Sequence, residues 1–167
     1  MSNLLVNVAQ TQAVMLLAQS QANLNLAVQA LQQAITGTQS AGATTLTLTT
    51  EQLQGIAVQI ELAVEAVVQA RVRQMQQIMV RIRGETDIRV RARQMQVANI
   101  LAQARANLSA TLRAVQRLLA MAQAMGGSVT VLVAAAQQIL AEIQAAVTAV
   151  AQAAVAQMQV VQIITMA

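Results

Sequence analysis

The stretch RVRQMQQIMVRIRGETDIRVRAR, residues 71–93, lies at the middle of the chain and decides how the rest of it folds. It holds seven of the ten arginines, and Gly84 near its centre is followed by Glu85, Thr86 and Asp87. On either side run long segments rich in Ala, Gln, Val and Leu, each interrupted again by glycine. This arrangement predicts two helical hairpins joined at Gly84.

The composition predicts one domain with an unusually neutral surface. A chain of 167 residues fits a single domain, residues 1–167, with a real core. It is 56% hydrophobic, 10% charged and free of aromatic residues, whereas a typical soluble domain has about 25% charged residues. Ten arginines against six acids give a net charge of +4, and Gln supplies most of the polarity.

Apolar residues recur at three- and four-residue steps, the spacing of one helix face, along four segments. These segments predict helices over about 3–36, 50–83, 87–125 and 129–166. Thr49 and Gln52 predict a capping box for the second helix, Gly37 the end of the first, and Ser128 or Thr130 the cap of the fourth. Short second and third connections make neighbours antiparallel. The expected fold is therefore all-α, an antiparallel up-down-up-down four-helix bundle.

An α+β fold with a small β-hairpin at 78–93 is the alternative. Residues 80–83 and 88–93 alternate strictly between apolar or small side chains and arginine, which is the period of a strand. Residues 44–49 and 128–133 alternate as well and are compatible with a small sheet. The Ala, Gln, Met and Arg around residues 78–93 have strong helix propensity, which favours continuous helices.

The residue types predict no enzyme. The chain has no His and no Cys, so disulfides, thiol chemistry and the usual zinc or haem ligands are excluded. Glu61 and Glu65 lie one turn apart and Glu142 could face them, but the Glu-x-x-His motif of di-iron bundles is absent. The glycines form no phosphate-binding loop. We expect no catalytic residue, cofactor, metal or small-molecule substrate.

The arginine cluster is the one candidate binding site. Guanidinium groups suit both phosphate backbones and anionic lipid headgroups. Against nucleic acid stands the lack of aromatic stacking platforms, and Glu85 and Asp87 neutralise part of the cluster. The other interpretation is a solvated tip that keeps a neutral protein in solution. The candidate residues are Arg71, Arg73, Arg81, Arg83, Arg89, Arg91 and Arg93.

No membrane span or signal peptide is expected. The mean hydropathy of +0.53 raises the question, and a spanning helix needs about 20 predominantly apolar residues. Here a Gln, Asn, Arg or Glu interrupts nearly every helical turn, even in residues 129–166. The N-terminal MSNLLVNVAQTQ has neither a basic region nor a cleavage site. These features predict a soluble protein and leave its compartment open.

The reduced alphabet, the absence of Pro and the regular order of cap, helix and glycine resemble a computationally designed helical protein. Residues 5–35, LVNVAQTQAVMLLAQSQANLNLAVQALQQAI, are similar in composition to the terminal helices of flagellin-type axial proteins. That resemblance implies helices that stay neutral because neighbours in a filament bury them. Three hypotheses follow: a structural scaffold without catalysis, a self-assembling subunit forming a homo-oligomer or filament, or an arginine-tip module for nucleic acid or anionic membrane.

Overall fold

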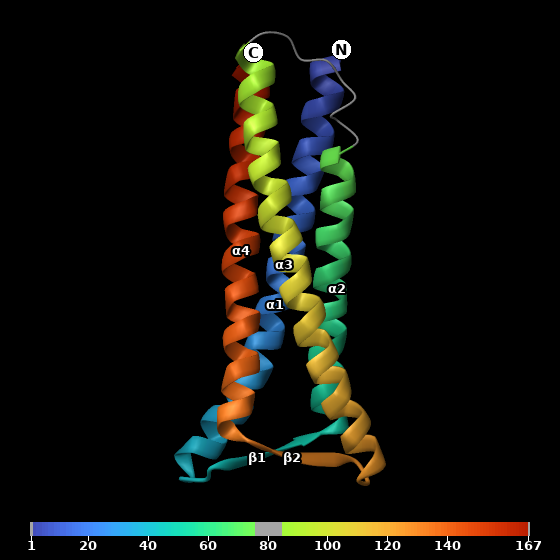
Figure 1. Ribbon diagram of the computed structural model, residues 1–167, viewed down its shortest axis with the longest axis vertical. Coiled ribbons are helices and arrows are strands. Elements are labelled where there is room, and N and C mark those ends of the chain that lie inside the picture. Colours follow the sequence, from blue (N-terminus) through green and yellow to red (C-terminus); the bar gives the residue numbers. More distant parts are fainter. Residues whose placement is uncertain (1, 76–84, 167) are drawn as a thin grey trace.

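The structure, a computed structural model, describes residues 2–75 and 85–166 of the chain. Four helices form an antiparallel up-down-up-down bundle, which confirms the predicted fold class (Figure 1). Helix α1 packs against α2 and α4, and α3 closes the ring by packing against the same two helices. The elements, in chain order, are α1 (Ser2–Ser40), β1 (Thr45–Thr49), α2 (Thr50–Met75), α3 (Glu85–Ala124), β2 (Ser128–Leu132) and α4 (Val133–Met166).

The capping box predicted at the start of α2 is present. The backbone N–H of Gln52 donates to Thr49 Oγ1 at 3.2 Å, and the N–H of Thr49 donates to Gln52 Oε1 at 2.9 Å. Two N–H groups that the helix itself leaves without partners are thereby satisfied. Glu51 stands in the first turn, where the helix dipole favours an anion.

The predicted end of the first helix is wrong. Helix α1 continues through Gly37 to Ser40, and the chain turns at Gly42, whose φ is 73°. A glycine inside a helix costs only about 1 kcal/mol relative to Ala, which the helix can absorb. The turn needs a residue in the left-handed region, and Gly42 supplies it.

The predicted start of the fourth helix is also wrong. Ser128 and Thr130 belong to strand β2, and α4 begins at Val133. Strand β2 pairs antiparallel with β1, from Thr45↔Leu132 to Thr49↔Ser128. Residues 44–49 and 128–133 alternate between apolar and polar side chains, which suggested a small sheet. Here this alternation prevails over helix capping, because one face of the sheet packs on the core. Leu46 and Leu48 of β1 are buried there.

The β-hairpin alternative at 78–93 is wrong for residues 85–93, which are the first turns of α3. Residues 78–84 lie outside the described residues, as does the predicted part of the second helix after Met75. Helix propensity outweighs the alternation of Arg and apolar residues in 88–93, because a lone pair of strands has little stability of its own.

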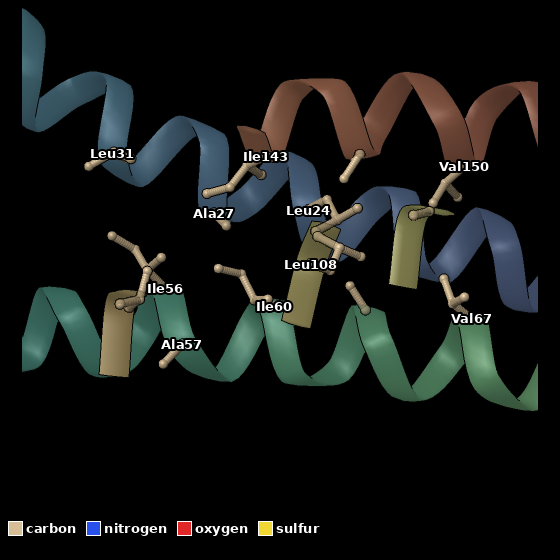
Figure 2. Close-up of a cluster of buried hydrophobic side chains, with 14 of the residues drawn as sticks. Leu24, Ala27, Leu31, Ile56, Ala57, Ile60, Val67, Leu108, Ile143 and Val150 are labelled. Atoms are coloured by element: carbon tan, nitrogen blue, oxygen red, sulfur yellow. The ribbon is translucent and has the colours of Figure 1, made fainter. Parts of the chain in front are cut away.

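The core runs along the bundle axis and contains aliphatic side chains from all four helices (Figure 2). Leu24, Ile60, Leu108 and Ile143, one from each helix, are completely buried. Burial of one such side chain contributes about 1.5–3 kcal/mol. These hydrophobic contacts, rather than the sparse charges, hold the bundle together.

The two halves of the chain are copies of one helix–strand–helix unit. LAQSQANL at 17–24 recurs as LAQARANL at 101–108, and AVEAVVQARVRQM at 63–75 recurs as AVTAVAQAAVAQM at 146–158. Units α1–β1–α2 and α3–β2–α4 have the same element order, and their strands pair with each other. The bundle therefore has a local two-fold axis through its sheet.

A polar layer interrupts the core near the end opposite the sheet. It contains one glutamine from each helix, and the repeat equates Gln10 with Gln94 and Gln74 with Gln157. All four side chains are at least nine-tenths buried. The layer separates the main core from a small cluster of Val90, Val160 and Ile164.

Candidate functional site

The described part of the predicted arginine cluster lies at one end of the bundle. Arg71 and Arg73 stand in the last turns of α2, and three arginines stand in the first turns of α3, at the end opposite the sheet (Figure 1). These helix ends touch, because Gln74 Nε2 donates to the carbonyl oxygen of Gln94 at 2.7 Å. Arg81 and Arg83 lie outside the described residues.

The arginines nevertheless divide between two sides of the bundle. Arg73 lines a groove between α1 and α2, together with Met15. Arg89 and Arg93 line a groove between α3 and α4, and Arg93 Nη1 donates to Gln96 Oε1 at 3.3 Å. The structure therefore brings these side chains to one end without gathering them into one groove.

Charge is distributed unequally between the helices. Helix α1 has no charged residue, and α4 has one, Glu142, which accepts a hydrogen bond from Thr111 Oγ1 at 3.0 Å. All ten arginines lie between Arg71 and Arg117. Because α1 packs against α4, two neighbouring helices present a surface that is almost free of charge. We call the exposed side chains of α1 and α4 the α1–α4 face.

Large apolar side chains are exposed on α1 and α4, and two of them lie beside arginines: Met15 lines a groove with Arg73, and Val155 lines one with Arg93. Met15 is 65% exposed and Val155 is 61% exposed. Single exposed apolar residues are common on soluble proteins. The exposed large apolar residues of α1 and α4 are Val8, Met15, Leu26, Val155 and Met158.

Within the described parts of the chain, two helices are long and apolar enough to cross a membrane, namely α2 over Thr50–Gln74 and α4 over Val133–Ile164. In their most apolar windows, 44% and 28% of the residues are buried inside the bundle. A core helix of a soluble protein has the same length and composition, so these values alone assign neither helix to a membrane. The expected absence of a span stays a prediction.

The acidic side chains predicted as candidates do not converge on one point. Glu61 accepts a hydrogen bond from Gln116 Nε2 of α3 at 3.3 Å, whereas Glu65 accepts one from Gln69 Nε2 of its own helix at 3.3 Å. Glu142 is engaged with Thr111. Within residues 2–75 and 85–166, no three His, Cys, Asp or Glu side chains are placed to hold a metal ion.

The nearly uncharged helix pair is a surface feature that the prediction from the arginines missed. The sequence already shows this, since residues 1–50 contain no charged residue and residues 118–167 contain only Glu142. What the sequence did not reveal is that these stretches fold side by side. No protein-family model, curated protein or solved structure matches the chain.

Proposed function

We propose that the protein is a structural subunit without catalytic activity, which assembles with copies of itself through the α1–α4 face. The observation that carries this proposal is the charge distribution: α1 and α4, which pack together, hold one charged residue between them, whereas all ten arginines belong to residues 71–117. A surface with neither sign of charge complements another neutral surface, and the same face on a second copy satisfies that requirement.

The area of the face suits a stable interface. Helices α1 and α4 have 39 and 34 residues, so each is about 50 Å long or more at about 1.5 Å per residue. Two such helices side by side, each about 10 Å across, span about 20 Å, so the face offers roughly 1,000 Å² per copy. A standard specific interface buries about 800 Å² per partner.

The net charge does not oppose this arrangement. Pairing through the α1–α4 face leaves α2 and α3 of each copy, with their arginines, on the far sides of the pair. Two helix layers, roughly 20 Å at about 10 Å per layer, then separate the two positive surfaces. That distance exceeds the Debye length of about 8 Å at physiological ionic strength.

The repeat supplies a matched pair of variants for the test. Ala22 of α1 and Ala106 of α3 are both exposed and occupy the same place in the repeated QANL and RANL sequences. Ala22→Lys puts a charge on the α1–α4 face, and a two-fold interface receives it twice. Ala106→Lys adds the same charge to the opposite side of the bundle.

Sedimentation equilibrium measures the oligomeric state of each variant. A protein concentration range of about 1 to 100 µM covers ordinary interface affinities. We expect an oligomer for the unmodified chain and for Ala106→Lys, and weaker association by about tenfold or more for Ala22→Lys. A monomer at every concentration overturns the proposal, as does equal weakening by both variants. Flotation of the unmodified chain with neutral lipid vesicles, at the expense of the oligomer, would assign the face to a membrane instead.

A further inference from the structure

A cavity lies at the sheet end of the bundle, lined by residues of all four helices and both strands. Its volume is about 290 Å³. Its lining includes several pairs of residues that the repeat relates, from the strands and from the adjoining turns of the helices. Three of these pairs are Leu31 and Val115, Leu48 and Val131, and Ile56 and Ile139.

One exchange between the repeats accounts for part of this space. Leu53 of α2 corresponds to Ala136 of α4, and both line the cavity. Both side chains are buried. The smaller residue leaves space that a leucine would fill, and neighbouring side chains relax only partly into such a gap. Part of the cavity thus arises from a sequence difference at one core position.

The lining is apolar with one exception. Every lining side chain is Ala, Val, Leu, Ile or Met apart from Arg117. Arg117, Met121 and Ala135 are exposed, which locates the opening of the cavity. In the first repeat the residue equivalent to Arg117 is Gln33. The cavity therefore has an apolar interior and a single guanidinium group beside its mouth.

We propose that this cavity binds a small apolar monocarboxylate, with the hydrocarbon part inside and the carboxylate on Arg117. Small-molecule sites are commonly apolar concavities with a few polar groups that fix orientation. An apolar cavity of about 150 Å³ accommodates benzene, with its six carbon atoms. The present volume of about 290 Å³ accordingly suits a ligand of roughly ten to twelve non-hydrogen atoms.

The charge of Arg117 selects among ligands of that size. A guanidinium group pairs with a carboxylate through two parallel hydrogen bonds, and charge-assisted bonds are stronger than neutral ones. No acidic side chain lines the cavity, so nothing in its lining competes for Arg117. A neutral alcohol of equal length would fill the interior and gain less at the mouth.

Octanoate and 1-octanol are suitable probes, because they differ only in the head group. Isothermal titration calorimetry with each ligand is carried out on the unmodified chain and on three variants. Arg117→Gln removes the head-group contact, and Ala136→Leu fills the interior by copying Leu53 of the other repeat. Arg105→Gln is the matched control, an exposed arginine of the same helix that does not line the cavity.

We expect octanoate to bind about tenfold more tightly than 1-octanol. In Arg117→Gln that preference disappears, while 1-octanol binds as before. Ala136→Leu loses both ligands, and Arg105→Gln changes neither. Circular dichroism verifies that each variant is folded, and Ala114→Leu, also on the cavity wall, replaces Ala136→Leu if the latter does not fold.

Three results would overturn the inference. One is the absence of binding for both ligands, and another is equal affinity for octanoate and 1-octanol. The third is a filled variant that binds octanoate as well as the unmodified chain, which would place the ligand elsewhere.

Discussion

The hydroxyl oxygens of Thr47 and Thr130 lie 3.4 Å apart across the centre of the two-stranded sheet. These residues form the middle pair of its register, and each comes from one of the two repeats. The local two-fold axis of the chain therefore passes between them. Two connections that would otherwise be independent loops are joined by a backbone ladder across the base of the bundle (Figure 1).

The two faces of β1 should differ in their contribution to stability. Leu46 is 4% exposed and belongs to the main core, whereas Thr47 is exposed. Leu46→Ala should lower the free energy of unfolding by about 2–4 kcal/mol, because it removes buried methyl groups and leaves a cavity. Thr47→Ala should cost less than about 1 kcal/mol, the range for an exposed cross-strand pair.

Urea denaturation followed by circular dichroism measures both changes at one protein concentration. Equal costs for the two variants would mean that the sheet does not cover the core. A cost above about 2 kcal/mol for Thr47→Ala would mean that its pair with Thr130 does more than an ordinary cross-strand contact.

The fold class and four helices followed from the sequence because apolar spacing at 3.6 residues is a local signal. The capping box at Thr49 is local too, and it was confirmed. The short strands were harder to predict, since five-residue segments become stable only by pairing across the chain. Ser128 and Thr130 suit a helix cap when considered alone, but β1 provides a partner strand.

The surface proposed for self-assembly was only partly predictable. The uncharged stretches are visible in the sequence, yet their meeting on α1 and α4 is a property of topology. Arg73 and Arg93 are only twenty positions apart in the sequence. Arg73 nevertheless lines a groove between α1 and α2, whereas Arg93 lines one between α3 and α4. The internal repeat was available at the outset, because LAQSQANL and LAQARANL are plainly related. Recognising it would have predicted the two-fold axis and the equivalent glutamines.

Replacement by alanine should change the stability of the protein in opposite directions at Gly37, which is helical, and at Gly126, which lies in a turn. Gly37 lies inside α1, and a Cβ placed there meets no atom within 4 Å. Gly37→Ala should therefore stabilise the protein by about 0.5–1 kcal/mol. Gly126 has a φ of 92°, which L-residues rarely adopt, and Gly126→Ala should cost about 1–3 kcal/mol. Thermal unfolding of the two variants side by side checks the signs, and stabilisation by Gly126→Ala would contradict the observed turn.

Ser20 provides a contact that only the first repeat has. Its hydroxyl is buried and donates to the carbonyl oxygen of Ala63 at 2.9 Å, which links α1 to α2. The second repeat has Ala104 at the equivalent position, also fully buried. Ser20→Ala should cost about 0.5–1.5 kcal/mol, the net value of one neutral hydrogen bond, and leave the fold intact. A loss above about 3 kcal/mol in urea denaturation would show that the hydroxyl also supports packing.

The glutamine layer should yield a gain in stability when it is made apolar. Gln157 is completely buried, and neither its Nε2 nor its Oε1 has a hydrogen-bond partner. A buried polar group without a partner costs about 1–3 kcal/mol, and leucine has a similar volume without that cost. Gln157→Leu should therefore raise the free energy of unfolding by about 1–3 kcal/mol.

The control for this change is Gln103→Leu, at an exposed position of α3, where we expect a change within about 0.5 kcal/mol. Urea denaturation of both variants at one concentration gives the comparison. Destabilisation by Gln157→Leu would mean that the amide is paired with Gln10 or another member of the layer in solution.

The same layer has a second consequence, because buried polar residues at one level can fix which positions of neighbouring helices face each other. If that holds here, Gln10→Leu combined with Gln157→Leu should stabilise the bundle while broadening its side-chain NMR signals, and sharp signals from a single state would show that the hydrophobic contacts alone fix the pairing.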